Sequence, residues 1–482
     1  MARDFRWAYL LLVAVMLILS GCSDSENKQT SADELKTGLK KDEIRNEAFK
    51  DLFPLQYDSY KKNEKMEDTK YSGSEKRSKF DHDKEPYLPI LFNGYGFAIE
   101  YNEDRGHTYA NEDIRSVARI TDKSIGSCLT CKSTAVPHMI EEMGDDYWNG
   151  NFNKDIWPKA EAMGHSPIGC SDCHDPQTMD LRVTRPSFIK AMESQGIDMS
   201  NPTKNDMRNY VCGQCHVEYY FAADNGEVTY PWSKGFKPEE MYEYYETTAK
   251  EKGFDKDWVH NVSGTPILKS QHPDFETHMS GPHGKAGVTC ADCHMPYERV
   301  DGKKKISSHW WTSPLKTMEQ SCSTCHSNRD MKDLKERVTD IQDTHMKALH
   351  KAEDVSITAH YYVNKMITSK VSEDKVKQAQ EHIRKGQWFW DFVAAESSAG
   401  FHNPQGSMDS LRISTEASNE AIRIATEELV KARVDLEELN EEIEKAKKTV
   451  YDERDNFKKK DHAINSYFPA QQPPVPPSAA KK

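Results

Sequence analysis

The sequence is poor in apolar residues. Only 36% of its 482 residues are hydrophobic, 30% are charged, and its mean hydropathy is strongly negative. Taken alone, this composition is typical of a chain that cannot bury enough apolar surface to stay folded. A compact fold is therefore expected only if something other than leucine, isoleucine and valine supplies part of the core.

The sequence also lacks an excess of basic residues. It has 65 lysines and arginines against 78 aspartates and glutamates, which gives a formal net charge of -13. Nucleic acids bind to basic faces, so this balance excludes a nucleic-acid partner. An anionic substrate would be repelled at long range and would need a local cationic site.

No cysteine is left for a structural disulfide, because ten of the eleven lie in five C-x-x-C pairs and the last is Cys22. Four pairs are followed directly by histidine, at Cys170, Cys173 and His174, at Cys212, Cys215 and His216, at Cys290, Cys293 and His294, and at Cys322, Cys325 and His326. In C-x-x-C-H the thiols bind the vinyl groups of a c-type haem, and the histidine is an axial ligand of its iron. Zinc sites usually place their histidines several residues away from the cysteines, so four such motifs favour haem over zinc.

The first pair, Cys128 and Cys131, is followed by Lys132 where the other four have histidine. Five covalently bound haems c would supply the apolar surface that the composition lacks. An electron carrier gains nothing obvious from an amine ligand, whereas the axial ligand can set the electronics of an iron that turns over a small molecule. The sequence therefore predicts that one haem of five differs from the rest and is catalytic.

The N-terminus is expected to be a targeting segment. Arg3 and Arg6 precede an apolar stretch, and Leu19-Ser20-Gly21-Cys22 resembles a bacterial lipoprotein box. We expect a signal peptide over 1–21, an acylated Cys22 and a flexible tether over 22–43; the alternative is an uncleaved membrane anchor, for which the apolar run is short. The protein would then be extracytoplasmic and lipid-anchored to a bacterial membrane, where c-type haem is attached.

The rest of the chain divides into two regions and a tail. The haem motifs predict a pentahaem catalytic region over 44–328, built of short helices and loops because the motifs are unequally spaced and rich in glycine and proline between them. Long helices are predicted at Asp330–Tyr361, Ser372–Ala395 and Ser410–Asp455, within a region over 329–465 that packs on the haem core. A disordered proline-rich tail follows over 466–482. The expected fold class is mainly α, a multihaem cytochrome c with few short strands.

Apolar residues of the last predicted helix follow a heptad seam. They are Ile422, Ala425, Leu429, Ala432, Leu436, Leu439, Ile443, Ala446 and Val450. Spacings that alternate between three and four are typical of a coiled-coil face. Two interpretations remain open: the seam packs on its own body, or, as we favour, it forms the interface of a homodimer.

The second axial ligands cannot be chosen from spacing. Four bis-histidine haems need four histidines beyond those of the motifs, and of the nineteen histidines fifteen remain. His107, His283 and His402 each stand near glycine or proline, but a lone histidine is more often a surface or hydrogen-bonded residue.

Several separated motifs together carry a family resemblance. One C-x-x-C-K and four C-x-x-C-H motifs occur in order with Arg105-Gly106-His107, with Val217-Glu218-Tyr219-Tyr220, with Lys269-Ser270-Gln271-His272-Pro273 and with Gly287-Val288-Thr289-Cys290. In this respect the chain closely resembles the ammonia-forming pentahaem cytochrome c nitrite reductases, from about Asp51 through the long C-terminal helices.

The resemblance implies an axial ligand set. Lys132 would be the proximal ligand of the catalytic haem, whose other face is open to substrate. The four distal histidines would be His107 for the Cys212–Cys215 haem, His309 for the Cys170–Cys173 haem, His402 for the Cys290–Cys293 haem and His283 for the Cys322–Cys325 haem. Arg119, Tyr219 and His272 would form the catalytic pocket.

The resemblance also implies one Ca²⁺ beside that pocket, bound by the side chains of Glu218 and Gln271 and the carbonyls of Tyr219 and Lys269. These are the hard oxygen donors that calcium prefers. In the pocket, Arg119 would hold nitrite, and His272, whose ordinary pKa suits proton transfer, would pass protons with Tyr219.

The implied reaction is the six-electron reduction of nitrite to ammonium, with electrons from a membrane quinol-oxidising multihaem cytochrome. Two alternatives remain: a lipid-anchored electron-transfer cytochrome with every haem six-coordinate, and a reductase of hydroxylamine or sulfite at the same open haem.

Overall fold

The computed structural model describes residues 36–71, 73–76, 78–80 and 85–453. Three predicted features lie outside these residues: the signal peptide over 1–21, the acylated Cys22 and the proline-rich tail over 466–482. Of the predicted tether, residues 36–43 are described, and Thr37 is bonded to the folded body. Its amide donates to the Gln177 carbonyl at 3.0 Å, and its hydroxyl donates to the Pro176 carbonyl at 2.5 Å.

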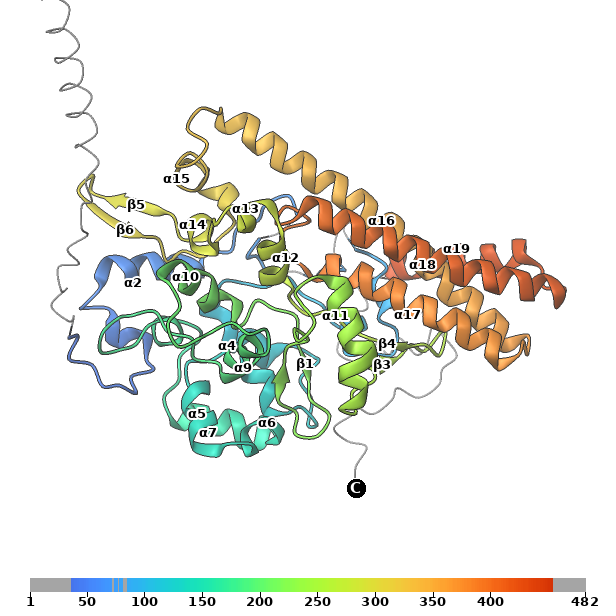
Figure 1. Cartoon of the computed structure of the whole chain (residues 1–482), viewed down its shortest axis with the longest axis horizontal. Helices are drawn as coiled ribbons and strands as arrows, with labels where there is room; N and C mark the ends of the chain where they lie inside the picture. Colours follow the sequence, from blue (N-terminus) through green and yellow to red (C-terminus); the bar gives the residue numbers. More distant parts are fainter. Residues whose placement is uncertain (1–35, 72, 77, 81–84, 454–482) are drawn as a thin grey trace, which may run out of the picture.

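The chain is mainly helical, as predicted, and the region of the haem motifs consists of short helices joined by loops (Figure 1). The helices of this region are η2 Asn46–Phe49, α2 Pro54–Lys61, η3 Lys62–Glu64, α3 Leu88–Leu91, η4 Gly96–Ala98, η5 His107–Tyr109, α4 Ala110–Ser116, η6 Gly126–Leu129, α5 Val136–Met143, α6 Asp146–Asn149, η7 Phe152–Ile156, α7 Trp157–Ala162, α8 Cys170–Cys173, α9 Pro186–Ser194, α10 Lys204–Gly213, α11 Pro238–Tyr244, η8 Tyr245–Ala249, α12 Asp274–Ser280, α13 Pro282–Lys285, α14 Cys290–His294, η9 Pro314–Lys316 and α15 Met318–Ser321.

The strands of the described chain are short and form three separate antiparallel hairpins. They are β1 Tyr220–Phe221 with β2 Val228–Thr229, β3 Trp258–Val259 with β4 Pro266–Ile267, and β5 Tyr297–Val300 with β6 Lys304–Ser307. In the last hairpin, Tyr297 faces Ser307 and Val300 faces Lys304. No larger sheet joins the hairpins in the described residues, so helices and loops position the site.

Four long helices follow the last haem motif: α16 Met331–Thr368, α17 Glu373–Ala395, α18 Pro404–Lys431 and α19 Leu436–Glu453. The first two confirm the predicted helices, although α16 continues past Tyr361. Asp330 caps α16 by accepting the Lys332 amide. Asn403 caps α18 in the same way for Gly406, with proline as the next residue of the chain, where its missing N–H costs nothing.

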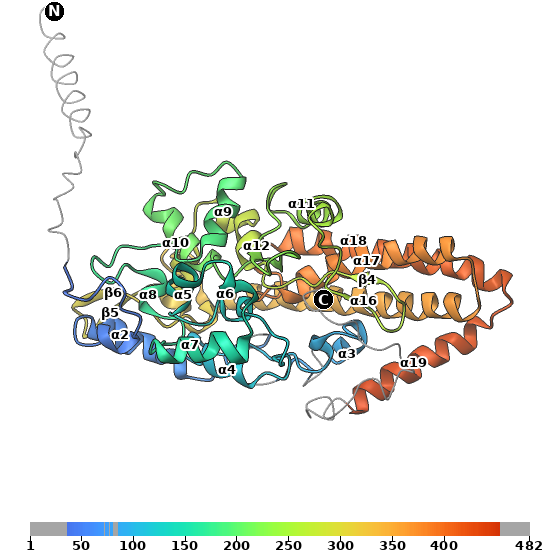
Figure 2. The same cartoon turned by 90° about the horizontal axis from the view of Figure 1, so that it is seen from below.

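The third predicted helix is wrong as a single element. It is two helices, because the chain turns between Lys431 and Leu436, where Arg433 has a left-handed φ of 56°. The continuous heptad spacing gave no sign of this turn, since Ala432 before Arg433 and Leu436 after it keep the spacing unbroken. As a result α19 folds back beneath the bundle toward α3 (Figure 2).

Seven of the nine seam residues pack within one chain, and Ala432, at the turn, is exposed, so the seam is not the continuous dimer face that we favoured. Leu429, Leu439, Ile443 and Val450 are each at most 2% exposed, and they share an apolar core with α16, α17 and the segment around Leu91. The Tyr362 hydroxyl also donates to Asn440 of α19 at 3.0 Å. The heptad pattern therefore records packing of α19 on its own body.

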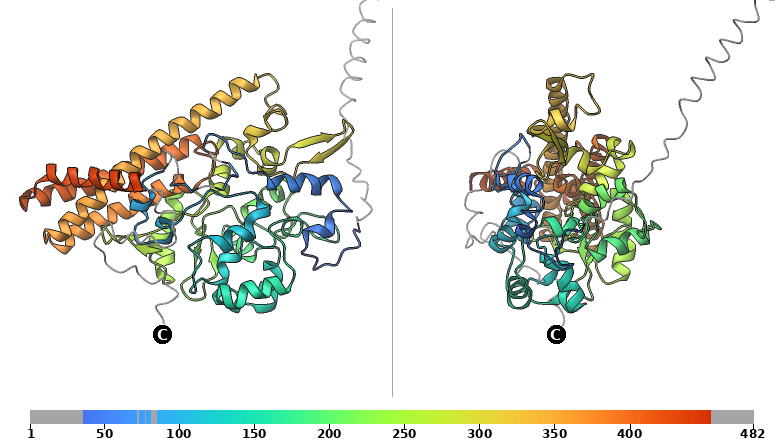
Figure 3. Two further views of the ribbon diagram at one scale, coloured as in Figure 1. Left: turned by 180° about the vertical axis from the view of Figure 1, so that it is seen from behind. Right: turned by 90° about the vertical axis from the view of Figure 1, so that its left-hand side faces the viewer.

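A second apolar core, rich in aromatic residues, lies in the region of the haem motifs. It includes Tyr147, Trp232, Phe275 and Trp388, all nearly fully buried. The two parts lie side by side, with the long helices extending from the motif region (Figures 1 and 3). Trp388 belongs to α17, so the long helices complete the second core as well. No helix within the described residues is long and apolar enough to cross a membrane.

Arg185, the residue before α9, ties together three haem-attachment loops. It is fully buried, and its Nη1 donates to Asp172 at 2.6 Å, inside the second C-x-x-C motif. Its Nε donates to the Thr130 carbonyl of the first motif at 2.8 Å. Its amide donates to Gln214, inside the third motif, at 3.1 Å. The guanidinium and the backbone amide of one buried residue thus bind three loops that lie far apart in the sequence.

The fourth and fifth attachment loops are connected to their neighbours by separate hydrogen bonds. The Arg208 guanidinium of α10 donates to Asp292, inside the fourth motif, at 2.6 Å. Asn209 accepts the Cys290 amide at 2.9 Å. The Ser321 hydroxyl, just before the fifth motif, donates to the Cys293 carbonyl at 2.8 Å.

Arg185→Met should lower the free energy of unfolding of the holoprotein by about 3–5 kcal/mol, because it leaves Asp172 buried without its cation. The control is Lys190→Met, on the same helix, whose ion pair with Glu227 is largely exposed. Guanidinium unfolding of both variants measures the difference. Equal midpoints and slopes for the two variants would show that Arg185 does not hold the loops together.

Candidate functional site

One large cavity runs through the region of the haem motifs. Its volume is about 2540 Å³, whereas a pocket for one small molecule measures about 300–1,000 Å³. All ten cysteines of the C-x-x-C pairs line it, together with all nine predicted axial ligands and with Arg119, Tyr219 and His272. The fold thus brings the predicted site residues to one interior space that has room for several cofactors.

Two of the attachment segments, α8 and α14, are single helical turns held by polar side chains. In α14, Thr289 and Asp292 form a capping box, and the Thr289 amide donates to the Asp292 carboxylate at 2.8 Å. In α8, Asp172 accepts the Gly169 amide at 2.9 Å. None of the ten described cysteines forms a disulfide. A helical turn between the two cysteines places both thiols on the cavity wall, as thioether bonds to one porphyrin require.

Neighbouring thiols show the order in which the attachment loops meet. The thiol of Cys131 lies against that of Cys215, and the thiol of Cys212 lies against that of Cys290. Cys293 is an electrostatic neighbour of Cys322. The third loop therefore lies between the first and the fourth, and the fifth loop follows the fourth.

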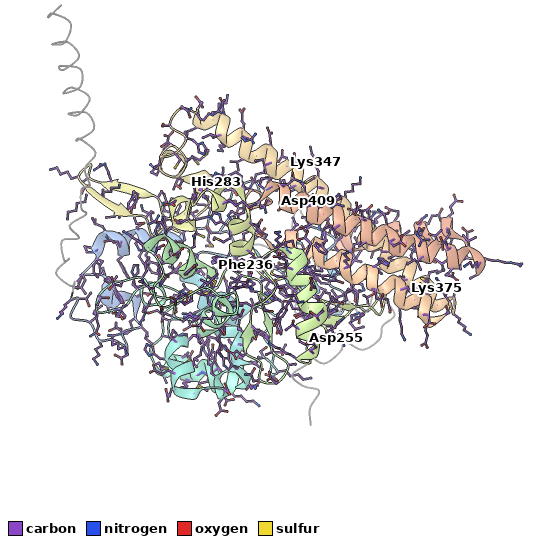
Figure 4. The ribbon with its side chains drawn as sticks, in the orientation of Figure 1. Phe236, Asp255, His283, Lys347, Lys375 and Asp409 are labelled. Carbon is purple, nitrogen blue, oxygen red and sulfur yellow. The ribbon has the colours of Figure 1, made fainter. Side chains whose placement is uncertain are left out.

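Each of the four motif histidines meets a second histidine across the cavity, and His402 in addition has the ring centre of His278 5.8 Å from its own. The ring centres are 5.9 Å apart for His107 and His216, 6.3 Å for His174 and His309, 6.3 Å for His294 and His402, and 6.4 Å for His283 and His326. Figure 4 labels His283, at the edge of the motif region toward α16.

This spacing fits an iron between each two rings. An imidazole nitrogen lies about 2.0 Å from a first-row metal ion, and the ring centre lies roughly 1 Å farther out, so two rings on opposite sides of one ion have centres about 6 Å apart. Each pair joins a motif histidine to the distal histidine predicted for that haem. The residues therefore fit four haems with two histidine ligands each.

Backbone carbonyls orient three of these rings. The Nδ1 atoms of His174, His294 and His309 lie 2.7, 3.0 and 3.0 Å from the carbonyl oxygens of Met179, Thr312 and Ser307. Such a bond fixes the protonated nitrogen and leaves Nε2 free for a metal.

Lys132 supplies an amine where the other four motifs supply an imidazole, and it is an electrostatic neighbour of Asp104, His107 and His272. The Arg119 guanidinium lines the same cavity and lies 4.0 Å from the Phe97 ring centre. Its buried Nε has no hydrogen-bond partner in the described chain. A buried guanidinium nitrogen without an acceptor is suited to an anion that enters from the cavity.

Tyr219 and His272 stand in the same space but are both neutral near pH 7. Burial raises the pKa of the Tyr219 hydroxyl above its ordinary range, and Arg119 and Cys128 are among its electrostatic neighbours. Burial lowers the pKa of His272 to about 4. The expected near-neutral pKa of His272 is therefore wrong, and its ring acts as a fixed hydrogen-bond donor or acceptor.

The predicted calcium ligands surround a buried carboxylate. Glu218 is fully buried, and it accepts the Tyr245 hydroxyl at 2.8 Å, the Ser270 hydroxyl at 2.9 Å and the Gln271 amide at 2.6 Å. Burial raises its pKa well above the ordinary range. The carbonyls of Tyr219 and Lys269 accept no hydrogen bond from any described residue. A buried carboxylate whose hydrogen-bond donors are all uncharged, beside two carbonyls that accept no hydrogen bond, fits a hard cation.

Sequence reasoning did not single out three carboxylates of this region. Asp104 lines the cavity, and its electrostatic neighbours are Lys132 and His272. Asp274 and Glu396 contact two of the paired histidines, His216 and His402. The position of Asp274, two residues after His272, could have marked it as a site residue. Glu396 and Asp104 lie outside the motifs and had no such signal.

Comparison with known proteins agrees with this geometry. The family model for cytochrome c552 matches residues 45–475. The cytochrome c nitrite reductase subunit NrfA of Nitratidesulfovibrio vulgaris is 43% identical over 455 residues, which are 88% of this chain and 86% of that protein. The cytochrome c-552 of Bacteroides thetaiotaomicron is 40% identical over 379 residues, which are 77% and 74% of the two chains.

A solved structure shares the fold as well. It is the catalytic subunit NrfA of cytochrome c nitrite reductase from Desulfovibrio desulfuricans, which is described with two calcium sites. The TM-score is 0.75 at 36% identity, over 90% of this chain and 92% of that one. The family match, the identity over most of the chain and the shared fold together show that the chain belongs to the cytochrome c552 family and is a cytochrome c nitrite reductase, a haem c enzyme.

Proposed function

We propose that the chain reduces nitrite to ammonium at a haem held by Cys128, Cys131 and Lys132. The reaction consumes six electrons and eight protons for each nitrite and yields ammonium and two waters. The observation that carries this proposal is the asymmetry of the site residues: each of the four motif histidines lies about 6 Å from a second imidazole ring, whereas the lysine of the first motif shares the cavity with the Arg119 guanidinium, whose buried Nε has no acceptor in the described chain.

The residues that would hold the five haems follow from the pairs. The four motif histidines and the four distal histidines His107, His309, His402 and His283 would ligate four irons, and Lys132 the fifth. When bound, the haems supply electron transfer and, at the lysine-ligated iron, an open position for nitrite.

Arg119 would hold the nitrite oxygens. Its guanidinium is always charged, it is planar, and its buried Nε faces no other acceptor in the described chain. Because Phe97 fixes the guanidinium from one side, Arg119 need not reorganise as charge develops on the oxygens. The local cation also offsets the repulsion of an anion by an acidic protein.

Tyr219 and His272 would orient the intermediates and pass protons by hydrogen bonds. Both side chains are neutral, so each can donate a hydrogen bond to an oxygen of the bound intermediate without bringing a charge into the pocket. Asp104, an electrostatic neighbour of both Lys132 and His272, is a candidate acceptor for the ring of His272.

We also propose that one Ca²⁺ is bound by Glu218, Gln271 and the carbonyls of Tyr219 and Lys269. The relative from Desulfovibrio desulfuricans, described with two calcium sites, supports this proposal. A cation there would neutralise the buried Glu218 carboxylate and fix the backbone of Tyr219 beside the pocket.

The proposal extends to the cellular setting of the enzyme. We place it outside the cytoplasm, tethered by an acylated Cys22 and fed by a membrane quinol-oxidising multihaem cytochrome. A homodimer would have to use outer faces of the long helices, since most of the heptad seam packs within one chain. Mass spectrometry of the mature N-terminus and sedimentation velocity test the anchor and the dimer.

The holoenzyme, supplied with a reduced viologen and nitrite, should form ammonium in a one-to-one ratio with the nitrite consumed. Its oxidised electron paramagnetic resonance spectrum should contain one haem that responds to nitrite. A spectrum in which every haem is low-spin and indifferent to nitrite would favour the electron-carrier alternative. Faster turnover of hydroxylamine or sulfite, with no ammonium from nitrite, would favour the second alternative.

Arg119→Ala should lower kcat/KM for nitrite by about 100-fold, since a single preorganised donor to a developing oxyanion is worth about 10²–10³. Arg119→Lys should lower kcat/KM by a smaller factor, because lysine keeps the positive charge but lacks the paired N–H donors of the planar guanidinium. The control is Arg115→Ala, which removes an exposed guanidinium that packs on Trp157 outside the cavity. An Arg119→Ala enzyme as active as the Arg115→Ala enzyme would remove Arg119 from the pocket.

Removal of calcium by a chelator should lower nitrite reduction, and Ca²⁺ added back should restore it. Glu218→Gln should reduce both the bound calcium, measured by elemental analysis, and the activity. Glu227→Gln, which alters an exposed ion pair, serves as the matched control. Full activity of an enzyme shown to be free of calcium would contradict a role for the ion.

A further inference from the structure

Two of the paired histidines contact a carboxylate where others contact a neutral oxygen. His216 Nδ1 lies 3.4 Å from Asp274 Oδ2, and His402 Nδ1 lies 2.5 Å from Glu396 Oε1. His174, His294 and His309 meet backbone carbonyls instead. Within the described chain, the four histidines of the His174–His309 and His283–His326 pairs have no hydrogen bond to a carboxylate.

Both carboxylates are held firmly by other donors. Asp274 accepts the Ser397 amide at 2.8 Å and the Ser397 hydroxyl at 3.2 Å. Glu396 accepts the Ser398 hydroxyl at 2.8 Å and the Ser398 amide at 3.1 Å. Both residues are nearly buried, at 9% and 6% exposure. Every contact is a donor to the carboxylate, which favours a fixed negative charge.

The two charges share one location. Glu396 directly follows α17, and its neighbour Ser397 bonds to Asp274 at the start of α12. Oxygens of Asp274 and Glu396 and a ring nitrogen of His402 all lie within 4.8 Å of one another. Asp274 therefore contacts His216 directly and also stands close to His402, whereas Glu396 contacts His402 alone.

A carboxylate that accepts the Nδ1–H of an axial histidine affects the iron in two ways. It raises the basicity of the ligating nitrogen, and it adds a negative charge nearby. Both effects stabilise the oxidised iron more than the reduced iron and lower the reduction potential. A carbonyl oxygen orients the ring but carries no net charge.

We propose that Asp274 and Glu396 are positioning residues that lower the reduction potentials of two particular haems, those attached through Cys212–Cys215 and Cys290–Cys293. This inference rests on the ligand pairs of the proposed function. The third attachment loop lies against both the first and the fourth, through the contacts of Cys215 with Cys131 and of Cys212 with Cys290. The strongest reductants would thus stand in the row that leads to the lysine-ligated haem.

The test is a potentiometric titration of the holoenzyme in which the low-spin ferric signals are followed by electron paramagnetic resonance. Asp274→Asn should raise the potentials of both haems, and Glu396→Gln should raise mainly that of the Cys290–Cys293 haem. Each shift should correspond to about a tenfold change in the reduction equilibrium, which is about 59 mV for one electron. Asp274→Glu, which keeps the charge, should stay near the wild-type potentials.

The matched control is Asp292→Asn. Asp292 lies in the attachment loop of the Cys290–Cys293 haem, but its oxygens bond to Thr289 and Arg208 and not to a histidine. The haem reduction potentials of the Asp292→Asn enzyme should therefore change little. If Asp274→Asn fails to mature, Glu396→Gln carries the test by itself.

Three results would overturn the inference. Unchanged potentials in Asp274→Asn and Glu396→Gln, with all low-spin signals intact, would refute it while leaving the proposed function in place. An equal shift in Asp292→Asn would show a general effect of charge and no role for the histidine contacts. Absence of bis-histidine signals from the wild-type enzyme would overturn both this inference and the proposed ligands.

Discussion

The buried ion pair between Arg185 and Asp172 is the contact on which the arrangement of the haem region depends. A guanidinium removed from water must satisfy all its donors, and here the acceptors belong to the first and second haem-attachment loops. The Gln214 side chain completes the junction, since it accepts the Arg185 amide and donates to the Asp172 carbonyl. Because covalent attachment fixes each haem to its loop, the geometry of this junction also sets the spacing between cofactors.

Around this junction the chain builds four similar sites and one different site. The four histidine pairs differ in what lies behind each ring: carbonyl oxygens in some, the carboxylates of Asp274 and Glu396 in others. The first motif ends in Lys132 where the others end in histidine, and the same cavity holds the Arg119 guanidinium, whose Nε has no partner in the described chain. In the proposed function, these small differences around a shared cofactor separate electron supply from substrate binding.

Much of the fold and site was predictable because covalent attachment leaves local motifs. The five C-x-x-C pairs, the mainly helical fold and the helices beginning near 330 and 372 can all be read from short stretches of sequence. The turn at Arg433 cannot, since heptad spacing continues through it. Apolar periodicity shows that a face is buried but not whether its partner is the same chain, so the seam was assigned to the wrong partner. The His272 pKa depends on burial, which no local pattern records.

The histidine pairs join residues far apart in the chain, and this has a consequence for biogenesis. His174 faces His309, and His294 faces His402, so the distal residue follows more than a hundred positions after the motif in each case. The Arg185 junction likewise needs Gln214 as well as Thr130. In the proposed export from the N-terminal end, the second motif would be available for haem ligation long before its proposed distal ligand emerges. Maturation would then pass through a chain that carries haem but is not yet folded, and that intermediate would need protection from proteases and from stray ligands.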